Sequence, residues 1–375
     1  MGRAPAETNI LIVGGGPAGL GAAIAARKAG FDVTVLDRSR PPIDKACGEG
    51  LMPDGVVALR EIGVDLNMGD GAPFRGIRFI DGGIEAEALF PEGSIGIGIR
   101  RTRLHEALVS EAERAGVALR WQTAASVDDA GIVTAEGRQL RYNWLIGADG
   151  IHSWVRQSAG LQIISSTRRR IGIRQHFRVE PWTDFVEVHW NRHCQANVTP
   201  VGPDEVCIAM IGTGREVRAS DIQDLFPKLA RRLCGAQEIG TPRGAVTLSS
   251  TLNSVVQGRT ALLGDASGTV DAVTGEGMHL AFRQAKVLIE ALVQDDLGLY
   301  SAAHRKLARM PLFMAEVLLI LDGRDTVRRT AFQSLAAFPS LFRALLAFHI
   351  GGHESPLFWA RGGSLPGARW AAEPS

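Results

Sequence analysis

The sequence predicts an α/β fold in which a mostly parallel sheet with helices is interrupted by an inserted antiparallel sheet. A strand, a glycine-rich turn, a helix and a second strand follow one another within residues 9–36, which is typical of a parallel strand pair. Closely spaced strand patterns separated by Pro, Gly and Asp fill residues 171–212, which indicates antiparallel pairing. Helical patterns dominate from residue 275 to about residue 350.

The first unit of the chain is the most clearly patterned. Residues 9–13 are a short apolar run with strand character, and they end in glycines. Residues 18–29 are rich in alanine and form a predicted helix, which Gly30 closes as a C-terminal glycine does. Residues 31–36 are a second apolar strand that ends at Asp37.

The remaining elements follow from periodicity and from turn residues. In the first half we expect an irregular segment at 38–54, helices at 55–63 and 102–115, a hairpin at 74–90, and strands at 117–121, 126–134 and 140–146. In the second half we expect strands at 171–179, 185–190, 195–201, 206–212, 244–250 and 256–263, and a helix at 221–233. The Gly-, Pro- and Ala-rich tail, 351–375, is expected to be loosely ordered.

Composition and charge exclude several classes of function. The chain has 375 residues, 45% of them hydrophobic and 22% charged, and its formal net charge is +1, which gives no electrostatic case for nucleic acid. No apolar stretch reaches the ~20 residues of a membrane span, and no secretory signal pattern begins the chain, so a cytoplasmic protein is expected. The four cysteines form no CxxC pair, so no metal site is expected.

The glycine-rich turn carries the first chemical motif. Gly14, Gly16 and Gly19 fit the pattern GxGxxG, with Pro17 and Ala18 between the last two. In a Rossmann-type unit, such glycines allow a tight turn, the approach of a pyrophosphate and close helix packing, while the helix N-terminus attracts the anion. Asp37, with Arg38 beside it, ends the next strand, where an acid accepts hydrogen bonds from a ribose.

Two further motifs separate FAD from NAD. The run Leu145-Ile146-Gly147-Ala148-Asp149-Gly150 ends one strand, and Arg156 follows it. The run Ala261-Leu262-Leu263-Gly264-Asp265-Ala266 ends another strand, and Gly275-Glu276-Gly277 then opens a helix. Together, over residues 8–295, the three motifs resemble the flavoprotein family of p-hydroxybenzoate hydroxylase and geranylgeranyl reductase.

This resemblance implies FAD as the cofactor and assigns it a set of contacts. Asp37 would hold the adenosine ribose, Arg101 would reach FAD, and Asp149 with Gly150 would lie under the pyrophosphate. Gly264 and Asp265 would contact the ribityl chain or its phosphate, and the turn Gly275, Glu276 and Gly277 would place a helix N-terminus beside the flavin. Arg101 could instead lie at the surface, because Arg100 and Arg103 offer alternative registers.

Three residues are candidates for catalysis. The stretch 45–53 contains Cys47, Gly48 and Glu49 and follows the second strand, where such folds send a loop toward the flavin. Cys47 and Gly48 could contact the flavin ring and Glu49 could donate a proton, or the glycines could only let the loop pass close by. Asp271, where the hydroxylases have proline, could act on the substrate or could cap the coming turn.

The resemblance also implies a division of the chain. Residues 1–75, 98–165 and 255–295 would form the FAD-binding domain, residues 76–97 and 166–254 a substrate-binding β-sheet, and residues 296–350 a helical C-terminal region. With one dinucleotide motif only, NAD(P)H would visit transiently as electron donor.

The favoured function is an FAD-dependent monooxygenase that uses NAD(P)H and O₂ on an apolar, aromatic or polyketide-like small molecule. The alternative is a carbon–carbon double-bond reductase resembling geranylgeranyl reductase. The Cys47 loop favours this alternative, but the stretch 195–202 lacks the aromatic residues of those reductases. A third possibility, a non-enzymatic prenyl-binding protein resembling GDP-dissociation inhibitors, is opposed by the intact FAD motifs.

Overall fold

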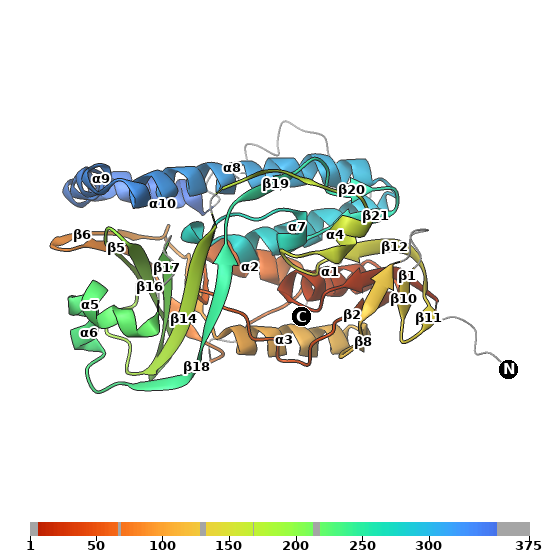
Figure 1. Ribbon diagram of the computed structural model, residues 1–375, viewed down its shortest axis with the longest axis horizontal. Helices are drawn as coiled ribbons and strands as arrows, with labels where there is room; N and C mark the ends of the chain where they lie inside the picture. Colours follow the sequence, from red (N-terminus) through yellow and green to blue (C-terminus); the bar gives the residue numbers. More distant parts are fainter. Residues whose placement is uncertain (1–6, 67–68, 128–132, 168, 213–217, 351–375) are drawn as a thin grey trace, which may run out of the picture.

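The computed structural model describes residues 7–66, 69–127, 133–167, 169–212 and 218–350, so the tail 351–375 lies outside the described residues. Figure 1 shows two sheets, one toward each end of the molecule, with a layer of C-terminal helices lying along both. The predicted α/β class, with an inserted antiparallel sheet and a helical C-terminal region, is confirmed.

The first sheet has six strands in the order β20-β21-β12-β1-β2-β8. Their bounds are β1 (Glu7–Val13), β2 (Val33–Leu36), β8 (Ala118–Arg120), β12 (Arg141–Gly147), β20 (Val256–Gln257) and β21 (Thr260–Leu262). All neighbouring pairs are parallel except β20 and β21, which form an antiparallel hairpin. The single strand expected at 256–263 is therefore two strands, with Gly258 in the turn at a φ of 55°.

Successive side chains of β1 point to opposite faces of this sheet, and both faces are covered by other elements. Ile10 and Ile12 point into a core shared with the helices α1 (Pro17–Lys28), α2 (Pro53–Glu61), α3 (Arg101–Arg114) and α7 (Gly277–Val293). Leu11 and Val13 point to the opposite face, where they meet α4 (Trp154–Ser158) and the small sheet of β9 (Ala125–Val127), β10 (Val133–Ala135) and β11 (Arg138–Gln139). Both faces are buried, as a parallel sheet requires.

The second sheet has seven strands in the order β18-β14-β17-β16-β15-β5-β6. Their bounds are β5 (Gly76–Asp81), β6 (Ile84–Leu89), β14 (Arg170–Arg178), β15 (Val186–Trp190), β16 (Cys194–Gly202), β17 (Glu205–Gly212) and β18 (Gln237–Thr247). All pairs are antiparallel except β15 and β5. Two short pairings complete the strands: β3 (Gly50–Leu51) and β4 (Ala72–Phe74) flank β7 (Gly96–Gly98), and β13 (Ile163–Ser166) pairs with β19 (Ser250–Leu252).

Helices cover both faces of the second sheet. On one face lie α5 (Ile222–Leu225) and α6 (Pro227–Arg232), and their buried residues pack against β14, β16 and β17. The helix expected at 221–233 is thus broken, because Pro227 lacks an amide hydrogen and cannot continue α5. On the other face, Phe79 of β5 contacts Phe332 and Phe342, with ring centroids 5.0 and 4.9 Å apart.

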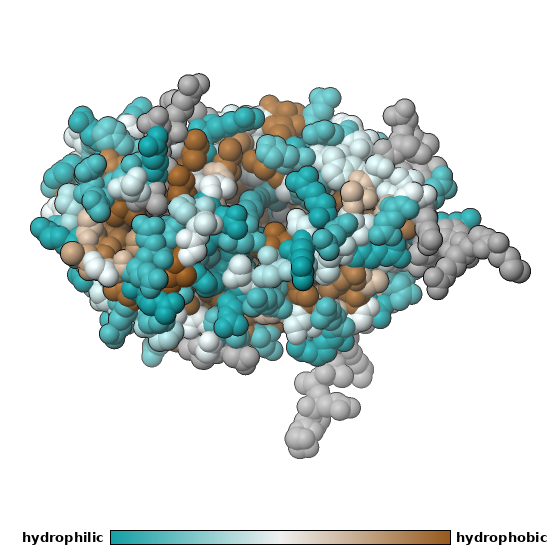
Figure 2. Space-filling view, turned by 60° about the horizontal axis from the view of Figure 1, so that its bottom comes forward, coloured by the Kyte–Doolittle hydropathy of each residue, from teal (hydrophilic) through white to brown (hydrophobic). Residues whose placement is uncertain are grey.

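The C-terminal region consists of three consecutive helices, α8 (Leu297–Gly323), α9 (Asp325–Ala337) and α10 (Pro339–His349), drawn in blue in Figure 1. No described helix is by itself long and apolar enough to cross a bilayer, although α9 and α10 together pass that test by length and composition, with a bend of 107° between them. Figure 2 shows another face of the molecule, on which hydrophobic residues form small patches among hydrophilic ones.

Candidate active site

The glycine turn between β1 and α1 combines tight packing with open space. A Cβ atom at Gly14 would lie 2.2 Å from the Ala148 carbonyl oxygen, and one at Gly19 would lie 1.9 Å from the Gly14 carbonyl oxygen. At Gly16, by contrast, no described atom lies within 4 Å of the Cβ position. Gly14 and Gly19 are therefore required by the fold itself, while Gly16 borders a space at the N-terminus of α1 that suits a pyrophosphate.

Asp37 closes this turn from the end of β2. One of its carboxylate oxygens accepts a hydrogen bond from the amide of Gly15 at 2.7 Å, and the other accepts one from the amide of Ser39 at 2.7 Å. Arg38, next to it, is exposed. The carboxylate is thus fixed at the rim of the glycine turn, where the ribose of a dinucleotide is expected.

His105 also supports the glycine turn, although it belongs to none of the sequence motifs. This side chain is fully buried on α3, and its Nε2 donates a hydrogen bond to the carbonyl oxygen of Gly15 at 2.8 Å. Burial lowers the pKa of His105, so the ring is neutral with the proton on Nε2. The signal in the sequence is a polar residue beside Leu104 on the apolar face of a predicted helix.

Asp149 and Gly150 lie beside the glycine turn, but the carboxylate of Asp149 has an intramolecular task. It accepts hydrogen bonds from the Ser153 hydroxyl, from the amide of Trp154 at 2.8 Å and from the amide of Val155 at 3.2 Å, so it caps α4. Gly150 has a φ of 84°, which favours glycine. The side chain therefore shapes the backbone that packs against Gly14.

The motif around Asp265 is tied to the motif around Asp149 by a buried arginine. Arg156 donates to the carbonyl oxygen of Ala266 at 3.2 Å and to that of Ile151 at 2.9 Å. Gly264 has a φ of 60°, and a Cβ atom there would lie 2.8 Å from the Cβ of Ala18. The two later motifs and the start of α1 therefore meet at one place.

Asp265 faces the segment before Cys47. Its carboxylate accepts a hydrogen bond from Lys45 Nζ at 2.7 Å, and both side chains are half-exposed. Burial alone would raise the pKa of Asp265, but the Lys45 ammonium outweighs it, so the pKa is lowered. This half-exposed ion pair contributes little to folding stability, so either side chain can leave the other and bind a ligand instead.

Arg101 begins α3 and points into the same region. Its Nη1 lies 3.5 Å from the sulfur of Met278 on α7, and its buried Nε has no hydrogen-bond partner among the described residues. Since its charge also influences the pKa values of Cys47 and Asp265, Arg101 lies in the site rather than on the outer surface.

The turn before α7 completes this region. Gly275 has a φ of 72°, and α7 begins at Gly277; no atom of the described chain lies within 4 Å of either Cβ position, or of that of Gly48. Between the two glycines, Glu276 Oε2 is buried and lacks a hydrogen-bond partner in the described part of the chain. Open space beside these glycines and Gly16, together with unpaired polar atoms on Glu276 and Arg101, leaves room and hydrogen-bonding groups for FAD.

Glu276 gives the site a measurable pH dependence. Burial, and then the nearby carboxylate of Asp54, raises the pKa of Glu276 from 4.5 to about 8. Below pH 4.5 the folded and unfolded chains are both protonated here, so no penalty arises. As the pH rises from 4.5 toward about 8, only the unfolded chain loses the proton, and folding stability falls by about 1.4 kcal/mol per pH unit.

We therefore expect Glu276→Gln to make the protein more stable than the original chain at pH 8 and to leave the stability at pH 4.5 nearly unchanged. Urea denaturation across this pH range measures the difference. The control is Glu113→Gln, on the exposed side of α3, which should shift no part of the profile. Equal stabilisation at both pH values would show that Glu276 is ionised in the folded protein.

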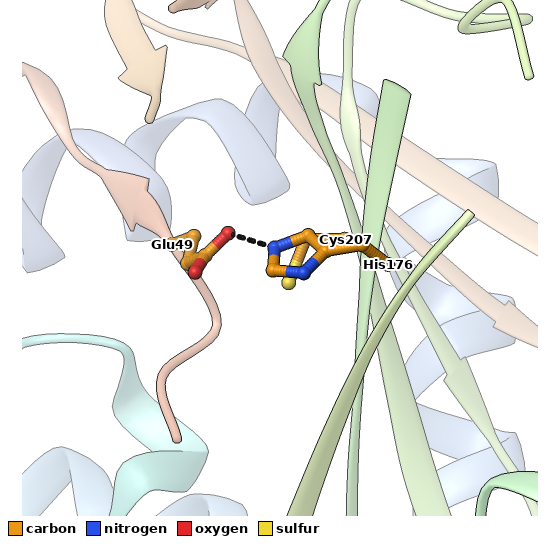
Figure 3. Close-up of side chains that lie close together, drawn as sticks. All are labelled: Glu49, His176 and Cys207. Carbon is orange, nitrogen blue, oxygen red and sulfur yellow. Dashed lines mark hydrogen bonds and ion pairs between the residues drawn. The ribbon is translucent and has the colours of Figure 1, made fainter. Parts of the chain in front are cut away.

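Glu49 lies at the junction between the two sheets, and Figure 3 shows it with His176 and Cys207. Its backbone has a φ of 59°, and its side chain is only 1% exposed. One carboxylate oxygen accepts a hydrogen bond from the amide of Arg101 at 3.0 Å, which caps α3, and the other accepts one from Nε2 of His176 at 2.6 Å.

Arg174 decides the proton positions in this cluster. Its Nη1 donates to Nδ1 of His176 at 2.8 Å, so Nδ1 carries no proton and Nε2 donates to Glu49. Arg174 also lies 3.8 Å from Glu49 and forms an ion pair with Asp44 at 2.5 Å. The Glu49 side chain therefore lies between a guanidinium, a helix N-terminus and an imidazole N–H.

The ligand atoms of Glu49, His176 and Cys207 all lie within 4.8 Å of one another, which is a spacing that a metal ion could use. Two features of the cluster oppose that use. First, the Arg174 guanidinium donates a hydrogen bond to Nδ1 of His176 and places a positive charge beside the cluster. Second, burial raises the pKa of the Cys207 thiol, which keeps this thiol protonated.

Cys47 lies two residues before Glu49, and the second sheet holds this loop in place. The Cys207 thiol lies 3.8 Å from the carbonyl oxygen of Cys47. The Thr199 hydroxyl donates a hydrogen bond to the carbonyl oxygen of Gly48 at 2.8 Å. Burial raises the pKa of the Cys47 thiol, although the Arg101 guanidinium opposes this effect. The loop therefore lies between the sheets, beside the open space at Gly48, and Cys47 keeps its proton.

The environment of Asp271 favours a role in capping the turn before α7 over a direct action on the substrate. Its side chain is fully buried, and one oxygen accepts hydrogen bonds from Arg170 Nη1 at 2.9 Å and from the amide of Val273 at 3.0 Å. Arg170 also pairs with Asp322 of α8 at 2.9 Å. The carboxylate thus caps the short turn before Gly275 and anchors it to β14.

The sequence also matches a family of known proteins. The family model described as FAD binding domain matches residues 7–296 of the chain. The chain belongs to this FAD-binding family. The protein is thus an FAD-dependent oxidoreductase, and the predicted cofactor is confirmed.

Relatives of this flavoprotein span nearly its whole length. Ubiquinone hydroxylase UbiL of Rhodospirillum rubrum is 30% identical, over 89% of this chain and 84% of its own. Menaquinone reductase of Mycobacterium tuberculosis is 26% identical, over 88% of this chain and 90% of its own. Among solved structures, p-nitrophenol 4-monooxygenase PnpA from Pseudomonas putida shares the fold, with a TM-score of 0.77 and 17% identity over 92% of this chain and 98% of its own.

Proposed function

We propose that the flavoprotein is a monooxygenase that uses NAD(P)H and O₂ to hydroxylate an apolar aromatic or quinonoid molecule. The observation that carries the proposal is the state of Glu49, the acid expected to serve a reductase as proton donor. Both of its oxygens accept hydrogen bonds, one from the amide of Arg101 and one from Nε2 of His176, so neither oxygen acts as a donor in this arrangement. The oxygen chemistry would then be supplied by bound FAD, and the protein would bind, orient and exclude water.

The likeness to other proteins supports this choice of reaction and substrate. The relative with 30% identity is by name a ubiquinone hydroxylase, and another relative, 26% identical, is by name an aurachin C monooxygenase/isomerase. The loop that follows Glu49 has apolar surroundings, since side-chain atoms of Val186 and Phe74 lie 3.7 and 3.8 Å from the Cβ position of Gly50. These buried side chains make the surroundings of the loop apolar, which suits a flat apolar ring more than a charged substrate.

A second candidate function, reduction of a carbon–carbon double bond, is favoured by Cys47. Its raised pKa keeps a proton on a thiol beside the open space at Gly48, as a proton donor requires. One relative with 26% identity is by name a menaquinone reductase, and one with 25% identity is by name a digeranylgeranylglycerophospholipid reductase.

The two candidates differ in the atoms that the product gains, and this difference tests the proposal. The holoenzyme is incubated with NAD(P)H, a panel of prenylated and alkylated quinones and quinolones, and isotopically heavy O₂. A monooxygenase gives a product that carries one heavy oxygen atom. A product that gains two hydrogen atoms and no oxygen, formed equally well without O₂, would replace the proposal with the reductase.

Substitutions in the loop make the same distinction. Under the proposal, Cys47→Ala and Glu49→Gln should lower the ratio of product to NAD(P)H consumed by less than about tenfold, because neither group transfers a proton in the oxygenation. Removal of a true proton donor costs about a hundredfold or more. Stoichiometry measured per bound FAD reports the result, and loss of product with normal flavin reduction would favour the reductase.

A further inference from the structure

The C-terminal helix α10 presents an apolar face outward as well as inward. Phe342, Leu346 and Ile350 point inward and belong to the core beneath β5 and β6. Phe338, Leu341 and Leu345 point outward and are 62%, 46% and 46% exposed. The outward residues follow one another at three and four positions, which places them along one side of the helix and makes them an exposed apolar stripe.

Exposed large hydrophobic side chains are concentrated in this part of the protein. Of the fifteen that the described residues contain, eight belong to α8, α9 and α10 or to the residue that joins α9 to α10. Beside the stripe lies a surface hollow of about 400 Å³, lined by the segment 89–92 and by Arg343, Ala344 and Ala347 of α10. Contiguous exposed apolar residues on a protein surface commonly mark an interaction site.

Charge distinguishes the possible occupants of this face. Helix α10 carries Arg343 and no acidic residue, and residues 324–350 contain four arginines and one aspartate. Arg324, Arg329 and Arg343 are all exposed. A C-terminal segment that combines an apolar stripe with exposed arginines matches the interface of an anionic lipid bilayer.

The packing of α9 and α10 determines how they would meet a membrane. Arg328 is buried and pairs with Asp81 of β5 at 2.9 Å, and Phe332 stacks on Phe79. The pair is also bent by 107°. The two helices are thus fixed on the second sheet, and a membrane contact would leave them lying in the interface rather than spanning it.

From these features we propose that the outward face of α10 docks the flavoprotein on the surface of anionic membranes. Docking would bring the hollow beside α10, lined by Phe90 and Ala347 among others, next to the acyl chains. The substrate would then be a membrane-dissolved lipid rather than a water-soluble aromatic, an inference that rests on the proposed function. The docking itself is independent of which reaction the flavin supports.

The test is flotation of the FAD-loaded protein with vesicles of equimolar phosphatidylcholine and phosphatidylglycerol, without NAD(P)H. The original protein should float with these vesicles and less with pure phosphatidylcholine. The double variant Leu341→Gln, Leu345→Gln should bind roughly tenfold or more weakly. The matched control, Ile164→Gln with Val293→Gln, alters two side chains that are 67% and 61% exposed outside this face and should bind like the original.

Several outcomes would overturn the proposal. The original protein could fail to float, or the stripe variant and the control could float equally. Removal of residues 351–375 could abolish flotation while the stripe variant keeps it, which would make the tail the docking segment. Sedimentation could show a dimer that only the stripe variant dissociates, without vesicle binding. Flotation involves no turnover, so its outcome does not depend on the heavy-oxygen experiment. If the protein floats but proves to be a reductase, only the proposed reaction is overturned and the docking proposal stands.

Discussion

Replacing Gly16 with valine is expected to give a folded protein that is isolated with little or no FAD. The position borders open space at the N-terminus of α1, so the new side chain would meet no described atom of the protein itself. It would, however, fill the space through which a pyrophosphate approaches the helix N-terminus. Loss of that contact and its electrostatic stabilisation should weaken FAD binding by about a hundredfold or more.

The ratio of flavin to protein absorbance after desalting measures this effect, and circular dichroism checks the fold. Gly83→Val is the matched control, since Gly83 also faces open space but lies in the turn between β5 and β6, and this variant should stay yellow. Gly19→Ala should instead disrupt folding, because its Cβ would lie 1.9 Å from the Gly14 carbonyl oxygen. Full yellow absorbance in Gly16→Val would show that FAD does not pass this turn.

The contrast between these glycines shows what the sequence alone could predict. The glycine motif, the strand before it and the helix after it are encoded within one short segment, so their geometry follows from local rules. The later motifs around Asp149 and Asp265 each end a strand, and parallel strands bring such ends to one edge of the sheet. That is why the fold class and the cofactor followed from the sequence and its family resemblance.

The junction between the sheets could not be predicted in the same way. Glu49 and His176 are separated by 127 positions, and neither lies in a motif that indicates the other. Their contact depends on how the inserted sheet docks on the first one, which no local pattern specifies. A single histidine in a strand pattern carries no signal of a partner, and so the role of Glu49 as a cap of α3 emerged only from the structure.

Asp271 illustrates the same limit, since its position after the Gly264-Asp265 pair suggested chemistry, whereas its partners come from distant segments. Arg170 of β14 and Asp322 of α8 complete the group, and Arg170 is 2% exposed. Two carboxylates around one guanidinium connect the inserted sheet, the turn before α7 and the C-terminal helices. The turn that positions Gly275 and Gly277 is thus held by charges far away in sequence.

Arg170→Met should therefore destabilise the protein by about 3–5 kcal/mol, because it leaves the fully buried Asp271 carboxylate without its counter-charge. Adding Asp271→Asn to Arg170→Met should recover part of this loss, since the amide carries no charge to bury. Urea denaturation of the two single variants and the double variant gives the coupling between the residues. Additive effects would mean that the ion pair contributes nothing to folding.

The same variants decide whether Asp271 also takes part in the reaction. If Asp271 only anchors the turn, Asp271→Asn should lower FAD occupancy and stability while turnover per bound FAD stays within about tenfold of the original. Arg328→Met is the control, because it removes another buried arginine, paired with Asp81 rather than with the turn before α7. A loss of about a hundredfold in turnover per bound FAD that is seen only in Asp271→Asn would instead make Asp271 an acid or base in the reaction. A residue that only positions the cofactor changes FAD binding, whereas an acid or base changes turnover by the bound FAD.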